Sequence, residues 1–440
     1  MYNRKPEDDE IRPHVRTDGK RSNCFVTEVT LRLGFFFAVP LRKEQFLSSG
    51  CIFSRSSRED SSITQGGETV KTMKAVRVFA TDDYSIREEP VPIPGPGEVL
   101  VQVEVTGLCR TDLKIIEHGH RDLVLPRIPG EEVVGKIVEI GSGGPPAAYH
   151  ETAGAAGGNG GTDTKRQIRF GDRVYVYPGT SCGTCPPCRG GAENLCRNMR
   201  IMGFHRDGGF AEYVSVPAES LIPVPGGISP ETAVFAEPLS CCLNAVELSG
   251  LCAGRGREDQ RQVSNAASGT EVGIWGAGPA GMLIARVVQG IGGKPLVYDP
   301  DPSRLAFAVE SGIQEMGEQN TFDAAFVAVG SADAYDYALA ALKPRGTLVV
   351  FSGLLPGKAE RDINFNRIHY LEQRIAGAYG CSFRHGEEAL QLIGSGSVKV
   401  TDMISHRLPF SKLGEALEIV KQRRGMKVHL YPESVKNRKN

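Results

Sequence analysis

Four cysteines fall in one short segment with the spacing C-x2-C-x2-C-x7-C: Cys182, Cys185, Cys188 and Cys196. Four soft thiolates this close are typical of tetrahedral zinc coordination. Because such a set leaves no open position for substrate, we predict a structural zinc site, with an iron–sulfur cluster as the alternative. The clustered, odd total of 11 cysteines does not suit a disulfide framework. This pattern indicates a reducing compartment, so we expect a cytoplasmic protein.

A glycine-rich turn is the second segment with a chemical use. It follows the apolar stretch 271–275 and opens an apolar-periodic helix over 282–288, and its key residues are Gly276, Ala277, Gly278, Pro279 and Gly281. In that context the glycines let the backbone approach a pyrophosphate, and the helix amino terminus supplies N–H donors.

A carboxylate that could bind the ribose of a dinucleotide follows this turn. The next apolar stretch, 294–298, ends at Asp299, which would accept hydrogen bonds from a ribose hydroxyl and repel a 2′-phosphate. We therefore expect NAD rather than NADP. Arg304 keeps NADP open, because it can pair with a phosphate or stack on adenine.

Two kinds of element must position these groups. Short alternating β segments separated by Gly and Pro occupy residues 74–79, 98–105, 133–140, 173–176 and 211–214. After residue 270 the pattern becomes strand, turn and helix, repeated, with further strands at 324–329 and 347–352. The predicted fold class is α/β, with a β-rich domain and a doubly wound parallel sheet.

Size and charge exclude several classes. A chain of 440 residues predicts two or three domains. Lys+Arg 51 against Asp+Glu 52 gives a net charge of -1, so no global field favours nucleic acid or an anionic membrane. The apolar patch at 35–41 is shorter than the roughly 20 residues of a membrane span. We expect neither nucleic acid nor membrane as a partner.

Three segments differ from the rest. Residues 1–72 match neither a secretory signal nor a transit peptide, and we expect a disordered extension or a translation start at Met73. Residues 141–166 consist mainly of Gly, Ala, Pro and Thr, which predicts a flexible surface insertion. The polar stretch 254–270 predicts another long loop.

From Met73 onward the chain resembles the zinc-dependent medium-chain dehydrogenase/reductase family, most closely the polyol branch that includes sorbitol dehydrogenase. The resemblance is carried by residues 107–112 (GLCRTD), 117–119 (EHG), 129–132 (PGEE), 171–174 (GDRV), the four cysteines, 237–240 (EPLS) and the 276–281 turn. It implies a GroES-like catalytic domain over 73–239 and 376–440 and a Rossmann NAD-binding domain over 240–375. It also implies an active site in the cleft between the domains and a homodimer or homotetramer.

The resemblance further implies a second, catalytic zinc ion bound at Cys109, Glu131, Glu132 and Glu237. Such an ion would polarise a substrate alcohol whose hydride passes to the nicotinamide. Thr111 matches the hydroxyl that begins the family's proton relay. The expected cofactors are therefore NAD and zinc.

Two positions depart from the family pattern. The residue after Gly130 is usually His and is Glu131 here, and the relay position that is often His is Lys114. Three negative ligands would weaken zinc as a Lewis acid. Either Lys114 offsets the added charge and serves as a proton donor or base, or Lys114 pairs with Glu131 and replaces the metal. As a third alternative, His118 or His120 supplies the missing imidazole.

Two functions follow from these alternatives. The first is a zinc-dependent oxidoreductase that transfers hydride from a secondary alcohol, in a polyol or sugar-like substrate, to NAD. The second is a catalytically weakened dinucleotide-binding protein that lacks the catalytic zinc and acts as a sensor or scaffold. Glu131 discriminates between them, because the first function requires two zinc ions per chain and the second requires one.

Overall fold

A computed structural model of the chain describes residues 62–65, 68–120, 122–142, 168–251, 267–354 and 357–436. Most of the 1–72 extension, nearly all of the 141–166 insertion and most of the 254–270 loop lie outside these ranges. The expectations for those segments therefore stay predictions, as do the domain limits.

A mixed seven-stranded sheet forms the β-rich part, in the order β10-β6-β5-β4-β18-β17 with β9 beside β4. Along β4 the residues Val99, Val101, Val103 and Val105 are all fully buried, as the alternating pattern predicts. We predict a strand over residues 211–214, whereas the corresponding strand in the structure, β9, begins at Tyr213. The bounds are β4 Glu98–Leu108, β5 Glu132–Ile140, β6 Arg173–Val176, β9 Tyr213–Pro217, β10 Leu221–Pro223, β17 Ile404–Pro409 and β18 Lys427–Tyr431.

A smaller antiparallel sheet precedes it and consists of β1 (Ser62–Gln65), β2 (Glu68–Ala80) and β3 (Asp83–Pro90). We predict a strand over residues 74–79 and consider Met73 as a translation start. In the structure β2 begins at Glu68, before both positions. Met73 itself is buried in this strand, together with Val76 and Val78. The strand is longer than predicted because its pairing with β1 and β3 extends past the apolar residues.

The second half is a parallel six-stranded sheet in the order β13-β12-β11-β14-β15-β16, which confirms the predicted α/β class. β14 and β15 start two and five residues before the predicted positions, at Phe322 and Leu342, because both residues are buried in the sheet. The bounds are β11 Glu271–Trp275, β12 Lys294–Tyr298, β13 Gln314–Glu315, β14 Phe322–Val327, β15 Leu342–Val350 and β16 Arg374–Gly377. Its helices are α5 Pro279–Gly290, α6 Pro302–Glu310, α7 Ala332–Ala340 and α8 Phe365–Leu371.

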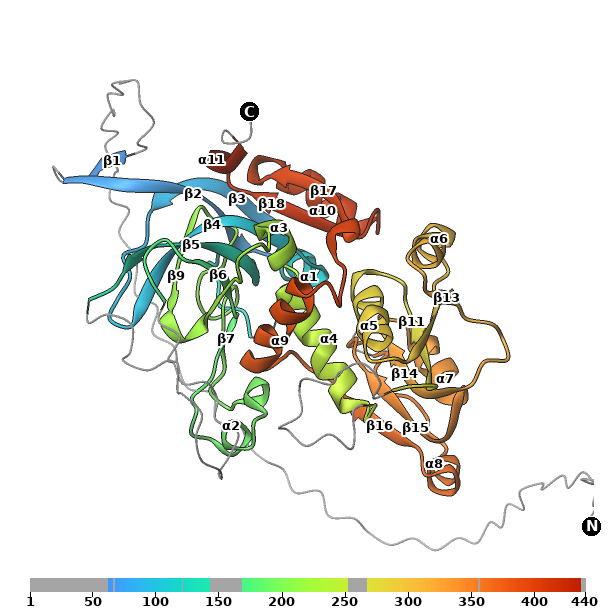
Figure 1. The fold of residues 1–440 in the computed structure, drawn as a ribbon. Coiled ribbons are helices and arrows are strands. Elements are labelled where there is room, and N and C mark those ends of the chain that lie inside the picture. Colours follow the sequence, from blue (N-terminus) through green and yellow to red (C-terminus); the bar gives the residue numbers. More distant parts are fainter. Residues whose placement is uncertain are drawn as a thin grey trace, which may run out of the picture. The chain divides into compact units, whose positions relative to one another are not determined.

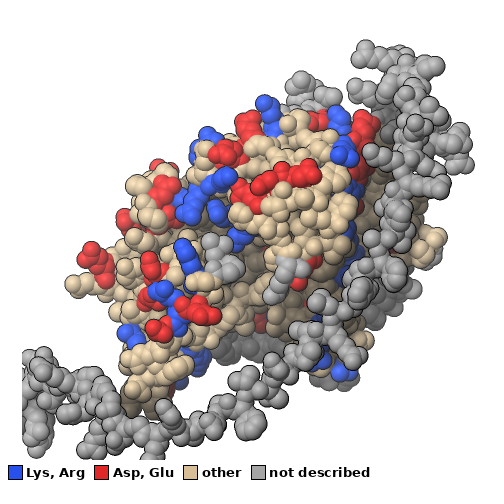
Figure 2. Space-filling view, turned by 180° about the vertical axis from the view of Figure 1, so that it is seen from behind, with Lys and Arg blue, Asp and Glu red and all other residues tan. Residues whose placement is uncertain are grey.

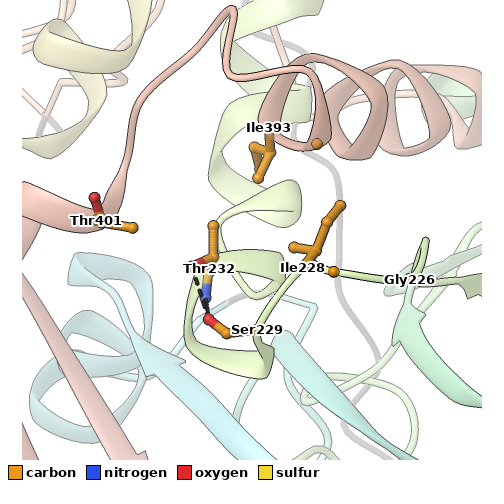
Figure 3. A pocket seen from close by; sticks show the side chains of 8 residues that line it. Gly226, Ile228, Ser229, Thr232, Ile393 and Thr401 are labelled. Carbon is orange, nitrogen blue, oxygen red and sulfur yellow. Dashed lines mark hydrogen bonds between the residues drawn. The ribbon is translucent and has the colours of Figure 1, made fainter.

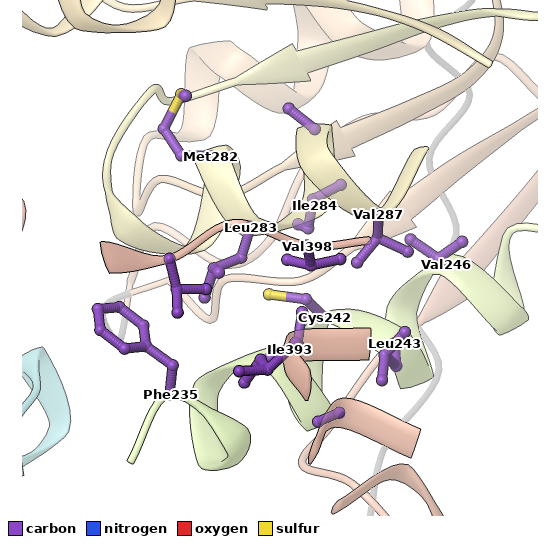
Figure 4. Packing of buried hydrophobic residues seen from close by; sticks show 14 of the residues in the cluster. Phe235, Cys242, Leu243, Val246, Met282, Leu283, Ile284, Val287, Ile393 and Val398 are labelled. Atoms are coloured by element: carbon purple, nitrogen blue, oxygen red, sulfur yellow. The ribbon is translucent and has the colours of Figure 1, made fainter. Parts of the chain in front are cut away.

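Helices α4 (Ala236–Leu248) and α9 (Phe383–Gly394) lie between the two sheets (Figure 1). Figure 4 shows Cys242 and Val246 of α4 facing Leu283, Ile284 and Val287 of α5, with Leu243 of the same helix and Ile393 of α9 beside them. All are buried in one hydrophobic cluster. This cluster joins the β-rich part to the parallel sheet and fixes the start of α4 relative to the glycine turn.

The carboxy-terminal segment returns to the β-rich part. β18 pairs antiparallel with β4 and parallel with β17, and α10 (Leu413–Lys421) packs on this side of the sheet (Figure 1). Further short elements include β7 Gly179–Thr180, α2 Pro186–Arg189, β8 Arg200–Ile201, α3 Pro230–Ala233 and α11 Glu433–Lys436.

The surface agrees with the near-neutral charge. Figure 2 shows a face on which basic and acidic side chains are intermingled. Within the part of the chain that the structure describes, none of the helices combines the length and apolar content needed to cross a bilayer.

Candidate functional site

The glycine turn lies between β11 and α5, as predicted. Gly276 has a φ of 104°, a conformation that L side chains rarely adopt. A Cβ at Gly281 would lie 1.7 Å from the carbonyl oxygen of Gly276, so the first turn of α5 crosses β11 at a distance that only glycine allows. Both requirements belong to a turn that presents backbone N–H groups to a phosphate.

Asp299 directly follows β12 and is almost fully buried. Its carboxylate accepts hydrogen bonds from the backbone N–H of Ala277 at 2.9 Å and of Asp301 at 3.0 Å. The acidic side chain is thereby fixed against the glycine turn, the place expected of a ribose-reading carboxylate.

Arg304 of α6 reaches over the same turn. Its Nη1 lies 3.8 Å from Oδ2 of Asp299, and a Cβ at Gly278 would lie 2.9 Å from that nitrogen. The Nε of Arg304 is buried and has no hydrogen-bond partner in the structure. The structure thus brings Gly276, Gly278, Asp299 and Arg304 together, as a dinucleotide site requires.

The four cysteines form a compact group, here called the zinc lobe, around α2. Their Sγ atoms lie 3.4 Å apart for Cys185–Cys188, 3.9 Å for Cys185–Cys196 and 3.5 Å for Cys182–Cys196. A ZnS4 tetrahedron with bonds of about 2.3 Å has edges of about 3.8 Å. The sulfurs therefore already stand near zinc-binding separations.

Hydrogen-bond donors support thiolates in the zinc lobe. The backbone N–H groups of Cys182 and Asn198 donate to Sγ of Cys196 at 3.2 and 3.3 Å. The Thr184 hydroxyl and nearby backbone N–H groups lower the pKa of Cys182 to about 5. Burial and the neighbouring sulfurs raise the pKa of Cys188 to about 12, so its thiolate needs the metal to form. Four sulfurs at these separations fit zinc.

The zinc lobe also holds the loop that leads into α9. The amide of Asn194 donates to the carbonyl oxygen of Tyr379 at 2.7 Å, and the Glu193 carboxylate accepts from the backbone N–H of Phe383. The lobe is thus connected to the segment that contains Cys381.

A second cluster, called the acidic cluster, contains the predicted catalytic ligands. Cys109 is the N-cap of α1 (Arg110–His118), Glu131 and Glu132 lie at the start of β5, and Glu237 lies in the first turn of α4. Asp112 completes a capping box, since its Oδ2 accepts from the N–H of Cys109 at 2.9 Å. Three separated segments therefore contribute to one cluster, in which Asp112 and Glu132 are buried and Cys109, Glu131 and Glu237 are partly exposed.

The buried cation of the acidic cluster is Lys427 of β18. Its ammonium forms an ion pair with Glu132, and the two side chains are only 4% and 1% exposed. Burial lowers the pKa of Lys427, but Glu132, Cys109 and Glu237 outweigh that effect, so the net pKa is raised. The predicted pairing of Lys114 with Glu131 is wrong, because Lys114 lies on the exposed side of α1.

Burial makes the other acids hard to ionise. It raises the pKa of Glu237 to about 8 and that of Asp112 to about 6, and it raises those of Cys109 and Glu131 as well. A divalent cation would favour the charged forms of these groups. Glu132 Oε2 and Asp112 Oδ1 are buried without a hydrogen-bond partner. The donor set and these unpaired oxygens suit a metal ion in their chemistry. In the described part of the chain, however, the ligand atoms of Cys109, Glu131, Glu132 and Glu237 do not all come within 4.8 Å of one another; Glu237 does so with Cys241 and Cys381 instead.

Gly107 shows how closely this cluster is built. A Cβ at this position would lie 1.8 Å from Oε2 of Glu132 and 3.0 Å from Cε of Lys427. The Glu132–Lys427 pair therefore lies directly against the β4 backbone, and no other residue fits there without displacing it.

Several candidate residues of α1 and of the segment after it lie on the surface. Thr111 and His118 are exposed. Glu117 pairs with Lys421 of α10 at 2.8 Å. His120 is also exposed and packs edge-on against Phe204, with ring centroids 5.1 Å apart. Neither histidine shows a contact with the acidic cluster, so the structure gives no support to a histidine ligand from this segment.

Sequence reasoning missed three residues near the predicted site. Cys241 and Cys381 lie beside Glu237, and their ligand atoms all lie within 4.8 Å of one another. His429 is fully buried near Lys427, and neither of its ring nitrogens has a hydrogen-bond partner. The alternation in residues 427–431 predicts a strand, but nothing local indicates which residues it meets.

A separate pocket of about 370 Å³ lies between α3, α9 and the 3-10 turn Thr401–Met403 (Figure 3). Its lining includes Ile228, Thr232 and Ile393 and contains none of the predicted site residues. It therefore takes no part in the candidate active site.

Two family models match the chain. The alcohol dehydrogenase GroES-like domain matches residues 95–226, and the zinc-binding dehydrogenase domain matches residues 279–395. The chain is 32% identical over 358 residues to L-threonine 3-dehydrogenase of Pyrococcus horikoshii, covering 76% of this chain and 91% of that protein. It is 28% identical over 350 residues to D-altritol 5-dehydrogenase of Agrobacterium fabrum, covering 78% and 94%.

Among solved structures, a zinc-binding dehydrogenase from Sinorhizobium meliloti 1021, bound to NADP, is similar with a TM-score of 0.69 and 29% identity. The match covers 82% of this chain and 100% of that one. The GroES-like sheet, the Rossmann sheet and the zinc lobe thus define a class of oxidoreductase. The chain belongs to the zinc-dependent medium-chain alcohol and polyol dehydrogenase family.

Proposed function

We propose that this protein oxidises a secondary alcohol of a polyol or sugar-like substrate with NAD as the hydride acceptor. One observation carries the proposal: the glycine turn with Asp299 and the thiol and carboxylate cluster around the buried Glu132–Lys427 pair occur in the same chain, joined by the hydrophobic packing of α4 on α5. Two cofactor sites with matching chemistry are what an alcohol dehydrogenase needs.

In this proposal Cys109, Glu131, Glu132 and Glu237 hold the catalytic zinc. When bound, zinc lowers the pKa of the substrate alcohol and the nicotinamide accepts the carbinol hydride. Lys427 offsets the negative charge of Glu132, its ion-pair partner. Thr111, two residues after Cys109 and exposed, passes the alcohol proton toward solvent. The zinc lobe holds the second, structural zinc.

Gly276, Ala277, Gly278, Pro279 and Gly281 hold the pyrophosphate, and Asp299 binds the adenosine ribose. NAD is preferred because the Asp299 carboxylate would repel a 2′-phosphate. Arg304 lies beside Asp299 and stacks on the adenine.

The substrate class rests on the relatives. One relative acts on threonine and the other on the polyol altritol, and both names denote oxidation of a secondary alcohol. We further propose that the protein is a cytoplasmic homodimer or homotetramer, which size-exclusion chromatography with light scattering tests.

The decisive experiment is a panel of polyols, sugar acids, sugar phosphates, threonine and simple alcohols, assayed with NAD and NADP. We expect NADH formation with at least one polyol or sugar-like alcohol and two zinc ions per chain. Asp299→Ala should raise the NADP to NAD ratio of kcat/KM by about 10-fold or more, because it removes the carboxylate that repels the 2′-phosphate; a 10-fold change corresponds to about 1.4 kcal/mol. Asp301→Ala is the matched control, because Asp301 caps α6 on its exposed side.

The alternative is a sensor or scaffold that binds dinucleotide without turnover. The observation that favours it is the Glu132–Lys427 pair, which already neutralises one predicted ligand. NADH binding with no turnover, one zinc per chain and no activity gained in Glu131→His would establish this alternative.

A further inference from the structure

His429 of β18 is fully buried, yet within the described part of the chain neither of its ring nitrogens has a hydrogen-bond partner. The acidic cluster contains a second buried atom in this condition, the Oε2 oxygen of Glu132. A neutral imidazole carries one N–H donor and a carboxylate oxygen is an acceptor, so the two groups have complementary chemistry. We propose that His429 is a positioning residue for Glu132, linked to its Oε2 by hydrogen bonding, either directly or across one water molecule.

The register of three strands places the two side chains in one row. Gly107 of β4 pairs with His429 on one side and with Glu132 of β5 on the other, and both pairings are antiparallel. Residues directly opposite each other in such strands present their side chains on the same face, with Cβ positions about 4.5–5.5 Å apart. His429 and Glu132 therefore flank a position that has no side chain of its own.

The glycine between them brings the carboxylate within reach of the imidazole. A Cβ at Gly107 would lie 1.8 Å from Oε2 of Glu132, so this oxygen lies almost where that Cβ would stand. With the cross-strand spacing, Oε2 is then about 3–7 Å from Cβ of His429. An imidazole nitrogen can span that separation directly, or across one water molecule that has both groups as partners. Because a buried polar group without a partner is unfavourable, the link also stabilises both groups.

Packing against α4 identifies the face of the sheet on which this row lies. The His429 ring is edge-on to the ring of Phe235, the N-cap of α4 (Figure 4), with centroids 5.4 Å apart. Val105, two residues before Gly107 and so on the same face, belongs to the hydrophobic cluster of Phe235. Val428, the residue before His429, belongs to a different cluster. The His429 ring therefore lies on the α4 side of the sheet, as Glu132 does.

Lys427 pairs with the other oxygen of the same carboxylate. Its ammonium contacts Oε1 of Glu132, and it precedes His429 by two residues, so both side chains are on one face of β18. Lys427 already offsets the carboxylate charge, and it would repel a second cation, so His429 contributes as a neutral donor. With one partner on each oxygen, the orientation of the Glu132 carboxylate is fixed.

The link is compatible with the catalytic zinc of the proposed function. A carboxylate oxygen has two lone pairs, so Oε2 of Glu132 can accept a hydrogen bond and also bind the ion. Contacts that orient a metal ligand from outside typically contribute roughly 10–100-fold to metal affinity. The expected effect of His429 on zinc rests on the proposed function, whereas the link itself does not.

Nitrogen-edited proton NMR of the histidine rings tests the link in the full chain, with the zinc lobe filled and no second equivalent of zinc. A buried, hydrogen-bonded ring N–H exchanges slowly with solvent and is therefore visible. We expect such a signal from His429, assigned by its loss in His429→Leu and shifted in Glu132→Gln. His385 is the internal reference, because its Nε2 lies 3.0 Å from Oε2 of Glu247. A cross-peak between the His429 ring proton and water identifies a link across water, and its absence identifies a direct one.

Zinc titration of the same lobe-filled chain tests the positioning role. His429→Leu keeps an apolar side chain of similar size but loses the donor, and it should weaken the second equivalent by about 10-fold or more. His429→Gln keeps an N–H donor and should recover most of that loss, which separates hydrogen bonding from packing. The matched control is His406→Leu on the neighbouring strand β17, because His406 pairs with Val428 and its Nδ1 is 3.0 Å from the Ser405 hydroxyl. This control should bind zinc like the wild type, and thermal unfolding shows that each variant is folded.

Three results overturn the inference. They are the absence of a slowly exchanging His429 signal, a signal that Glu132→Gln leaves unchanged, and a zinc affinity of His429→Gln no higher than that of His429→Leu. Failure of the wild type to bind a second zinc, or to oxidise any alcohol, instead counts against the proposed function alone, because the NMR measurement requires neither.

Discussion

The zinc lobe takes all four ligands from residues 182–196, whereas the acidic cluster collects Cys109, Glu132, Glu237 and Lys427 from separated segments. The lobe sulfurs remain partly accessible apart from Cys196, while Glu132 and Lys427 are fully enclosed. A local site needs only its own turns and its metal. A dispersed site needs the whole fold, and it must balance its charges in the protein interior.

The largest effect should come from breaking the buried charge pair of the dispersed site. Lys427→Met leaves Glu132 enclosed without its counter-charge, and we expect the free energy of unfolding to fall by about 3–5 kcal/mol. Urea unfolding measures this. The double variant Glu132→Gln, Lys427→Met should recover most of the loss; if it is as unstable as Lys427→Met alone, the ion pair is not the cause.

The zinc lobe should instead lose stability when its metal ion is lost. Cys196→Ala should remove one zinc ion, and the lost binding energy should lower the free energy of unfolding by about 2.7 kcal/mol when free zinc is 100-fold above its dissociation constant. Metal analysis and thermal unfolding at fixed zinc test this. Chelator should destabilise the wild type but have a smaller effect on the variant, and equal effects would contradict a structural zinc.

Low pH should lower the free energy of unfolding because of His429, which is buried near Lys427 of the acidic cluster. Burial lowers the pKa of His429 to about 3, so below its usual value of 6.5 the unfolded chain binds a proton that the folded chain does not. Stability is therefore lost as the pH falls from 6.5 toward 3, by about 2 kcal/mol at pH 5. His429→Leu should remove this dependence in pH-dependent urea unfolding. Protonation of the lobe thiolates affects both proteins alike, so a parallel pH profile would exclude His429.

The smallest effect should come from replacing Lys114, which is close to Cys109 in the sequence but does not reach the acidic cluster. Lys114 is exposed, and its replacement by Met should change the free energy of unfolding by no more than about 0.5 kcal/mol. Its effect on kcat/KM should be less than that of Lys427→Met. A loss of activity in Lys114→Met equal to that in Lys427→Met would restore Lys114 to the site.

The same contrast explains what the sequence could predict. The zinc lobe and the glycine turn are read from contiguous residues, because turn geometry and ligand spacing are local properties. The strands 173–176 and 294–298 match the structure at both ends, since apolar alternation or an apolar run marks them. The fold class follows from the order of such elements.

Lys427 could not be chosen over Lys114 from the sequence. Lys114 lies close to Cys109 along the chain, but α1 turns it outward, while Lys427 reaches Glu132 only because β18 pairs with β4. Cys381 meets Cys241 for a similar reason, since α9 packs on α4. These pairings depend on tertiary contacts between distant segments, which no local pattern encodes.

The contacts between the zinc lobe and the Tyr379–Phe383 loop have a consequence for loss of the metal. Asn194 and Glu193 of the lobe hold this loop, which leads into α9. Removal of zinc that unfolds the lobe should therefore release the loop as well, and so loosen the start of the helix that packs on α4.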